Sequence, residues 1–267
     1  MSILHDFHMH SAFSADSNTP AELMAARAVD LGLSGICFTD HQDTDAPIKD
    51  PLFEVNFEQY FSSLMQLREL YRGKLDIGIG MEYGIQPHLA DDLKYLTTKY
   101  SYDFIIASVH FLYGSDPYYS DFFDGRDEAQ VYHDYFCYQL DCLKALSNFD
   151  TLGHLDYVTR YGPDRKHVYS YKKFADSIDP LLKHIITSGK CLEVNTGGYR
   201  HVGETNPCID ILRRYRELGG ERITIGSDAH NPGHMALEFN RTEELLKSLG
   251  FTYYVIFQER KGTEVFL

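Results

Sequence analysis

Histidine and carboxylate side chains recur in this chain at spacings that could place them in one metal site. The chain begins with HDFHMHSAFSAD, in which His8 and His10 are two residues apart and Asp16 follows six residues later. If this segment starts as a strand, both imidazoles point to the same face, because side chains alternate along a strand. Near the other end, SDAH repeats the spacing of two with Asp228 and His230. We expect these side chains to share one target.

Further residues of this kind fall where other apolar runs end. They are Asp40 and His41 in FTDH, Glu82 in GMEYG, His110 in SVHF, His154 and Asp156 in GHLD, and Glu193 and Asn195 in LEVNT. Imidazole and carboxylate ligands without a thiolate suit Zn, Fe or Mn better than Ca or Mg. The candidates are too many for one tetrahedral ion, which takes about four ligands. The sequence therefore predicts a site for two or three divalent metal ions.

The segments between these residues alternate between helix and strand patterns. In TPAELMAARAVDLGL, Thr19, Pro20 and Glu22 predict a capped helix start with a capping box, and Gly32 predicts its end. Apolar periodicity predicts further helices at about 56–72, 87–98, 127–148, 171–188, 207–218 and 235–249. Short apolar runs predict strands at SGICFTDH, LDIGIG, DFIIASVH, FDTLGH, CLEVNT and ERITIGS, and FTYYVIF is expected to pair at a sheet edge.

This alternation predicts the fold class. About seven βα units follow one another without a Pro/Gly/Ser linker, so we expect an α/β fold in which residues 1–267 form a single domain, an irregular closed (β/α) barrel. In such barrels the active site lies at the C-terminal ends of the strands, where the candidate ligands fall. The long segments LYGSDPYYSDFFDGRD and DYVTRYGPDRKHVYS are expected to be lids or binding loops.

Composition limits the classes of partner. The formal net charge of −14 and the lack of a basic run argue against nucleic acid binding, so an anionic substrate would need a local positive centre such as metal ions. Five cysteines without a C-x-x-C pair fit a reducing compartment. No export signal opens the chain, and no apolar run approaches about 18 residues. We expect a cytoplasmic protein that does not enter a membrane and is a monomer or small homo-oligomer.

Taken in order, DFHMH, FTDH, GMEYG, SVHF, GHLD and SDAH resemble the polymerase and histidinol phosphatase (PHP) superfamily. Members are distorted (β/α)7 TIM-like barrels with a trinuclear metal centre. The segments HSAFSADS, FTDHQD, GHLDYVTRYGP and LEVNT further resemble the monofunctional histidinol-phosphate phosphatases of bacterial histidine biosynthesis. The resemblance implies hydrolysis of a small phosphate monoester, L-histidinol phosphate, to L-histidinol and phosphate.

The resemblance also implies which residues hold the three divalent ions, expected to be Zn with Fe or Mn as alternatives. The first metal would be held by His8, His10, Glu82 and Asp228, the second by Glu82, His110 and His154, and the third by Asp16, His41 and His230. Many relatives have a histidine where Asp16 stands. Because a carboxylate oxygen is a harder ligand, Asp16 would weaken the zinc preference of the third site or favour Fe or Mn.

For the reaction, we expect a hydroxide bridging the two metals that share Glu82 to attack phosphorus in line. The leaving alkoxide would take a proton from Asp228, His230 or a metal-bound water. Arg160 in VTRYGP and Arg200 in GGYRH are candidate phosphate ligands, since a phosphate dianion favours guanidinium partners. Candidate pocket residues for the imidazole and ammonium of histidinol are Ser11, Asp43, Glu193, Asn195 and the aromatic segment 111–123.

Other functions fit parts of the same pattern. Another PHP phosphoesterase would act on nucleotides or oligonucleotide ends. An amidohydrolase also begins with H-x-H, but DFIIASVH contains no lysine to serve as a carboxylated metal bridge. A non-catalytic PHP module would not need every ligand position filled. The histidines outside the pattern, namely His5, His88, His133, His167, His184, His201 and His234, are not expected to bind metal, and His201 lies near a possible substrate loop.

Overall fold

The computed structural model describes residues 2–47, 53–119 and 121–267, and a parallel sheet forms its centre. The strands are β1 (His5–Met9), β2 (Gly35–Phe38), β3 (His41–Gln42), β4 (Asp76–Gly84), β5 (Phe104–Ser108), β6 (Thr151–Leu152), β7 (Cys191–Asn195) and β8 (Ile223–Gly226). They follow the order β1-β2-β4-β5-β6-β7-β8, with β3 beside β4, and neighbouring strands are parallel.

The first and last strands of this sheet meet. The amide of Asp228 donates to the carbonyl of His8 at 2.8 Å, and the amide of His10 donates to the carbonyl of Ala229 at 2.9 Å. A parallel bridge joins Met9 and Ala229. The sheet is thus a nearly closed barrel, which confirms the predicted (β/α)7 TIM-like architecture.

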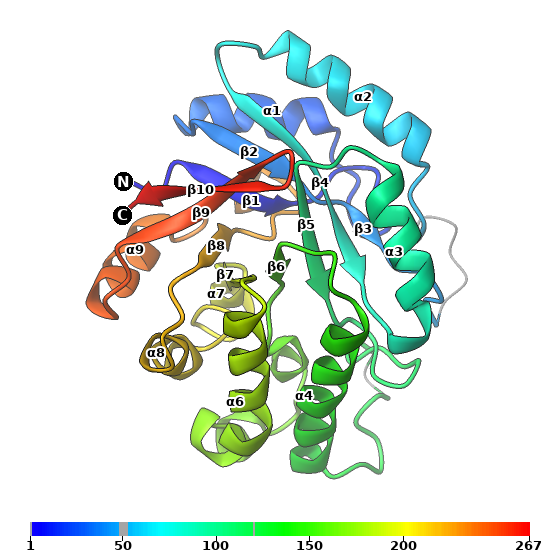
Figure 1. Ribbon diagram of the computed structural model, residues 1–267, viewed down its shortest axis with the longest axis vertical. Helices are drawn as coiled ribbons and strands as arrows, with labels where there is room; N and C mark the ends of the chain where they lie inside the picture. The colour runs from blue at the N-terminus through cyan, green and yellow to red at the C-terminus, as the bar shows by residue number, and fades with distance from the viewer. Residues whose placement is uncertain (1, 48–52, 120) are drawn as a thin grey trace.

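Helices surround the strands (Figure 1). The longer ones are α1 (Ala21–Asp30), α2 (Phe57–Leu70), α3 (Ala90–Lys99), α4 (Glu128–Ala145), α6 (Tyr171–Thr187), α8 (Ile209–Glu217) and α9 (Phe239–Ser248). The short helices are η2 (Pro87–Leu89), η3 (Tyr157–Arg160), α5 (Arg165–Val168), α7 (Gly198–His201) and η4 (Pro232–His234). Apolar residues three or four apart form the buried face of each long helix; in α6 they include Phe174, Ile178, Leu181 and Ile185.

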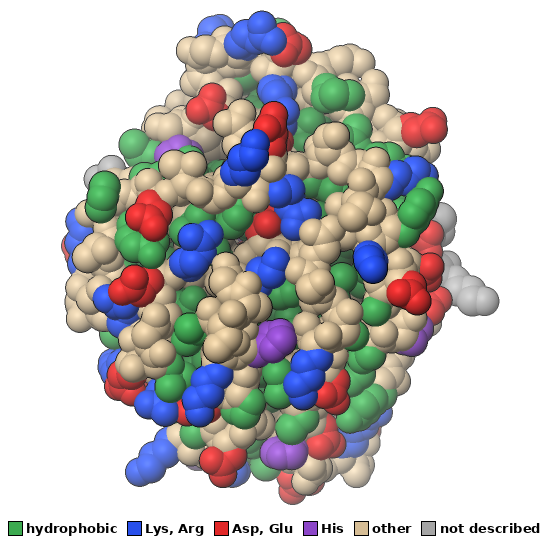
Figure 2. Space-filling model, viewed as in Figure 1, with side chains coloured by type: hydrophobic (Ala, Val, Ile, Leu, Met, Phe, Trp, Pro, Cys, Tyr) green, Lys and Arg blue, Asp and Glu red, His purple; other side chains and the backbone are tan. Residues whose placement is uncertain are grey.

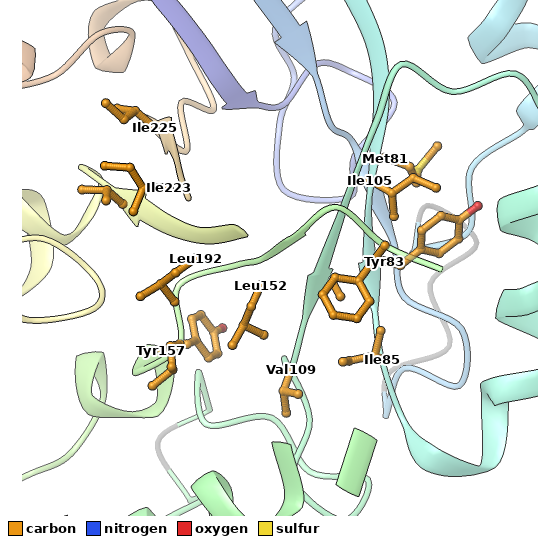
Figure 3. Packing of buried hydrophobic residues seen from close by; sticks show 14 of the residues in the cluster. Met81, Tyr83, Ile85, Ile105, Val109, Leu152, Tyr157, Leu192, Ile223 and Ile225 are labelled. Atoms are coloured by element: carbon orange, nitrogen blue, oxygen red, sulfur yellow. The ribbon is translucent and has the colours of Figure 1, made fainter. Parts of the chain in front are cut away.

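The larger hydrophobic cluster takes residues from successive strands. Met81, Ile105, Leu152, Leu192 and Ile223 are all buried there (Figure 3). Because side chains alternate along a strand, Glu82, the residue after Met81, is directed to the opposite face. Alternate side chains of the strand therefore pack against the helices, and the side chains between them face the barrel interior.

The C-terminal segment differs from its expected role as an edge strand of the main sheet. Strands β9 (Tyr253–Gln258) and β10 (Lys261–Phe266) form a separate antiparallel hairpin, which lies across the other strands in Figure 1. The reason is that β1 and β8 meet, so the barrel leaves no free edge beside them. Val255 and Phe257 pack instead on Phe7, Phe104 and Cys191, at the N-terminal end of the barrel.

The start of α1 also differs from the prediction. Helix α1 begins at Ala21, and Thr19 makes no capping hydrogen bond to it. Instead, the Thr19 and Ser17 hydroxyls donate to the carbonyl of His230 at 3.0 and 2.9 Å. The predicted capping box is therefore wrong, because a carbonyl from the other end of the chain takes the hydroxyl. The predicted helix end is confirmed: Gly32 has φ +72°, a left-handed conformation that favours glycine.

The molecular surface has a mixed charge. Figure 2 shows Lys and Arg side chains interspersed with Asp and Glu over one face.

None of the helices within the described ranges has the length and apolar character needed to span a membrane. All five cysteines are free, and four of them are buried.

Candidate metal centre

Glu82, near the end of β4, lies at the centre of the predicted ligand set. Its Oε2 is 3.0 Å from Nε2 of His8, and its Oε1 is 2.9 Å from Nε2 of His154 and 3.3 Å from Nε2 of His110. The Ser108 hydroxyl donates to the same Oε1 at 2.6 Å. The two oxygens of one buried carboxylate thus face two different groups of imidazoles, as expected of a bridging ligand.

The first predicted group contains residues from near both ends of the chain. Nε2 of His8 and Nε2 of His10 are only 3.1 Å apart. Asp228 Oδ1 lies 3.3 Å from Nε2 of His10 and 3.7 Å from Nε2 of His8. Closure of the barrel between β1 and β8 brings these residues together.

The third predicted group lies nearer to solvent. Asp16 Oδ2 is 2.8 Å from Nε2 of His230 and 3.5 Å from Nε2 of His41. The His10 ring stacks against those of His41 and His230, at centroid distances of 4.3 and 4.1 Å. The side chain of Asp16 is 53% exposed, whereas those of His10 and Glu82 are fully buried. This group therefore sits at the rim, continuous with the buried groups.

Hydrogen bonds behind the imidazoles fix which ring nitrogen faces the cluster. Nδ1 of His8 is 2.5 Å from Glu193 Oε1, Nδ1 of His110 is 2.8 Å from Asp43 Oδ1, and Nδ1 of His230 is 3.0 Å from the Asp228 carbonyl. A carbonyl or carboxylate can only accept, so each Nδ1 carries the hydrogen. A neutral ring then presents an Nε2 lone pair to the cluster, as metal-ligating histidines do.

This donor set fits a bound cation. Lone pairs on Nε2 of His8 and His110 would face the Glu82 oxygens at 3.0 and 3.3 Å, a repulsive arrangement unless a proton or a metal ion lies between. Within the described parts of the chain, the buried Nδ1 of His41 makes no hydrogen bond, although it lies 3.2 Å from Glu82 Oε2. Imidazoles and carboxylates without thiolate match Zn, Fe or Mn.

Without ions, protons would have to supply the positive charge. Burial disfavours the charged form of His8, but the carboxylates of Glu193 and Glu82 outweigh it and raise the pKa of His8 well above its ordinary value. Burial likewise disfavours the charged form of His41, but the carboxylates of Asp16 and Glu82 outweigh it and raise the pKa of His41 to about 9. Burial raises the pKa of Glu82, yet the neighbouring imidazoles bring it well below the usual range. The site therefore holds several buried carboxylates, whose negative charge favours protons or metal cations beside them.

A cavity of about 630 Å³ opens onto this cluster. Arg160 and Arg200 both line it. The guanidinium of Arg160 donates to Asp228 Oδ2 at 3.2 Å through Nη1 and to Asn206 Oδ1 at 2.8 Å through Nε, and its side chain is buried. Arg200 donates to the carbonyls of Ser227 and Asp228 at 3.1 and 2.8 Å. Both predicted phosphate ligands are therefore next to Asp228, a predicted metal ligand.

Two predicted pocket residues lie behind the cavity wall. The Ser11 hydroxyl is buried and donates to Asp40 Oδ2 at 2.9 Å. Asn195 is also buried; its Nδ2 donates to Glu193 Oε2 at 3.2 Å and to Asp228 Oδ2 at 3.3 Å. The expected contact of these two side chains with the substrate has no support in this placement, because hydrogen bonds to Asp40, Glu193, Asp228 and Arg160 occupy their polar atoms.

Several other residues have positions and contacts that their local sequence did not predict. Glu193 and Asp43, expected in the substrate pocket, hold His8 and His110, although Asp43 also lines the cavity. His201 and His234, not expected to bind metal, line the cavity beyond the ligand groups. The only available signal for these roles was position after a predicted strand, which does not identify a hydrogen-bond partner.

Comparisons with known proteins agree with this geometry. A family model described as PHP domain matches residues 6–197. A histidinol-phosphatase of Lactococcus lactis subsp. lactis (strain IL1403) is 30% identical over 257 residues, which cover 96% of this chain and 95% of that protein. A probable histidinol-phosphatase of Clostridium acetobutylicum is 30% identical over 252 residues, covering 92% of this chain and 94% of that protein.

Solved structures show the same relationship. The crystal structure of the Lactococcus lactis histidinol phosphate phosphatase, complexed with Zn, L-histidinol and phosphate, matches with a TM-score of 0.90 at 30% identity, covering 98% of this chain and 99% of that one. A putative histidinol phosphatase from Listeria monocytogenes shares the fold, with a TM-score of 0.73 at 19% identity, covering 89% of this chain and 99% of that one. On its motifs, its barrel and these matches, the chain belongs to the PHP domain family.

Proposed function

We propose that this protein is a metal-dependent histidinol-phosphatase, which hydrolyses L-histidinol phosphate to L-histidinol and phosphate in histidine biosynthesis. The observation that carries the proposal is the convergence of imidazoles and carboxylates on both oxygens of Glu82, beside a cavity lined by two arginines. The relative from Lactococcus lactis, whose structure contains Zn, L-histidinol and phosphate, supports the choice of substrate.

We assign three divalent ions, Zn with Fe or Mn as alternatives, to three groups of ligands, the first two of which share Glu82. The assigned ligands are His8, His10, Glu82 and Asp228 for the first ion, Glu82, His110 and His154 for the second, and Asp16, His41 and His230 for the third. Bound ions act as Lewis acids that stabilise charge on phosphoryl oxygens and lower the pKa of water. The carboxylate of Asp16 is the feature that would favour a harder ion in the third group.

The side chains have separate tasks in this scheme. Glu82 holds its two groups of imidazoles at a fixed separation through both oxygens. Arg160, fixed by Asn206 and Asp228, presents a preformed cation to the phosphate dianion, and Arg200 adds a second one at the same wall. Asp228 and His230 both line the cavity, where they would orient a water held by the ions as the proton source for the leaving alkoxide.

We further propose that residues 1–267 act as one catalytic domain, as a monomer or small homo-oligomer. The proposed substrate is a small phosphate monoester rather than a nucleic acid or a membrane component, because the cavity of about 630 Å³ suits a small molecule. The five free cysteines support a reducing, cytoplasmic environment.

The test is phosphate release from L-histidinol phosphate by protein loaded with Zn, Mn or Fe, compared with release from nucleoside bisphosphates and short oligonucleotides. We expect preference for L-histidinol phosphate, loss of activity on chelation and recovery on adding metal. A strong preference for nucleotides would replace the proposal with another PHP phosphoesterase. Undiminished turnover after complete metal removal would refute the metal-dependent mechanism.

A further inference from the structure

An aromatic wall runs from the metal ligands to the outer part of the cavity. The ring of Tyr157 lies 5.5 Å from that of His110 and 5.1 Å from that of His154, centroid to centroid. Tyr161 continues the row 5.2 Å from Tyr157, and Tyr118 follows 5.9 Å from Tyr161. All three tyrosines line the cavity, so a ligand that reaches the cluster with one end has aromatic faces along its other end.

One carboxylate, Asp116, lies beside this aromatic wall. It lines the cavity together with Tyr118 and Tyr119, and it is partly buried. Its Oδ1 accepts a hydrogen bond from the Tyr118 amide at 2.8 Å. Over the residues that the structure describes, no Lys, Arg or His forms an ion pair with it, whereas the nearby Asp43 is paired with His110 at 2.8 Å. Burial raises the pKa of Asp116, as expected for a carboxylate that lacks a cationic partner.

Asp116 differs from the other carboxylates that line the cavity, because Asp16, Asp43 and Asp228 each lie beside an imidazole or a guanidinium. Arg160 and Arg200 both contact Asp228, at the part of the wall assigned to the phosphate. Asp116 lies among tyrosines instead. A second anion beside a phosphate site would repel a substrate that carried only negative charge. It would favour a substrate that also carries a cationic group, since carboxylates and aromatic faces both attract ammonium groups.

We propose that Asp116 binds the ammonium group of the substrate and makes the enzyme select phosphate esters of amino alcohols over esters without an amine. This rests on the proposed function, in which L-histidinol phosphate carries its phosphate at one end, its imidazole at the other, and its amine on the carbon next to the phosphorylated one. With the phosphate at the cluster, the amine stays close to the metal-binding residues, and Asp116 lies within electrostatic reach of His110 and His41.

Asp116 also shapes its own loop, and the two roles can be separated. The Tyr119 amide donates to the Asp116 carbonyl at 3.2 Å, and Pro117 follows Asp116, as in a tight turn begun by an aspartate. Asparagine begins such turns equally well, because its side-chain oxygen accepts the same amide hydrogen bond. Asp116→Asn thus removes the charge and keeps the turn.

The experiment compares two substrates in the Zn-loaded wild type, in Asp116→Asn and in the control Asp121→Asn, an exposed position of the same loop outside the cavity lining. The substrates are L-histidinol phosphate and imidazolylpropanol phosphate, which lacks only the amino group. We expect Asp116→Asn to lower kcat/KM for L-histidinol phosphate by about tenfold to a hundredfold, mainly through KM, and to leave the ester without the amine unchanged. Asp121→Asn should match the wild type with both.

Product binding gives a second measurement. In calorimetric titrations, Asp116→Asn should weaken binding of L-histidinol by a similar factor and leave binding of imidazolylpropanol unchanged. Equal losses with both esters, or undiminished preference for the amine in the variant, would overturn the assignment while leaving the phosphatase proposal intact. A wild type that does not hydrolyse L-histidinol phosphate faster than para-nitrophenyl phosphate would overturn both.

Discussion

Replacing Glu193 by glutamine should weaken metal binding without touching a proposed ligand. In the structure Glu193 Oε1 faces Nδ1 of His8 at 2.5 Å, and Oε2 accepts from the His154 amide at 2.7 Å and from Asn195 Nδ2 at 3.2 Å. The side chain is only 1% exposed, so water cannot replace a lost bond. A carboxylate accepts at both oxygens, whereas glutamine accepts at only one.

Either orientation of the new amide causes a conflict. If its oxygen meets His8, its NH2 group faces the His154 amide and Asn195, which are both donors. If its oxygen meets the His154 amide instead, His8 must carry its hydrogen on Nε2, where it can no longer bind metal. An unpaired buried polar group costs about 1–3 kcal/mol, and loss of a carboxylate behind a ligating histidine lowers metal affinity about 10- to 100-fold.

The assay is the Zn²⁺ dissociation constant of Glu193→Gln, measured by competition with a chromophoric chelator, together with urea unfolding. We expect weaker affinity by about 10- to 100-fold and a free energy of unfolding lower by about 1–3 kcal/mol. The exposed Glu244→Gln serves as the matched control and should change neither. A Zn²⁺ affinity within about twofold of wild type would refute the role of Glu193 in orienting His8.

Three further predictions concern the cluster itself. Because Glu82 faces two groups of imidazoles, Glu82→Ala should lower the bound metal by more than one ion and abolish turnover; unchanged metal content by elemental analysis would exclude bridging. Arg160→Ala should raise KM for the phosphate ester by about tenfold or more, and an unchanged KM would remove Arg160 from the phosphate site. In chelator-treated protein, the pKa of His41 is raised from 6.5 to about 9, so its contribution to stability is complete below pH 6.5 and is lost as pH rises through about 9. Urea unfolding should show a decrease of up to about 3 kcal/mol over this window, and no decrease would contradict the assigned protonation.

Much of the fold and of the ligand set could be predicted because it depends on local patterns. Apolar periodicity identified the long helices and the parallel strands, and H-x-H and D-x-H placed pairs of side chains on one face of a strand. The barrel architecture then implied that residues such as Glu82 and His154, from different strands, would meet at one end. Local patterns failed at Thr19, whose hydroxyl bonds to His230 rather than to its own helix.

The sequence alone determined the types of candidate ligand, their order along the chain and the end of the barrel where they gather. It could do so because strand alternation and the parallel arrangement of βα units are set by neighbouring residues. Only the tertiary structure decided three contacts. Glu193 accepts a hydrogen bond from His8, and Ser11 donates one to Asp40. Within the described residues, Asp116 has no ion-pair partner and lies among tyrosines. Those choices depend on distances between side chains far apart in the chain, which exist only once the barrel has closed.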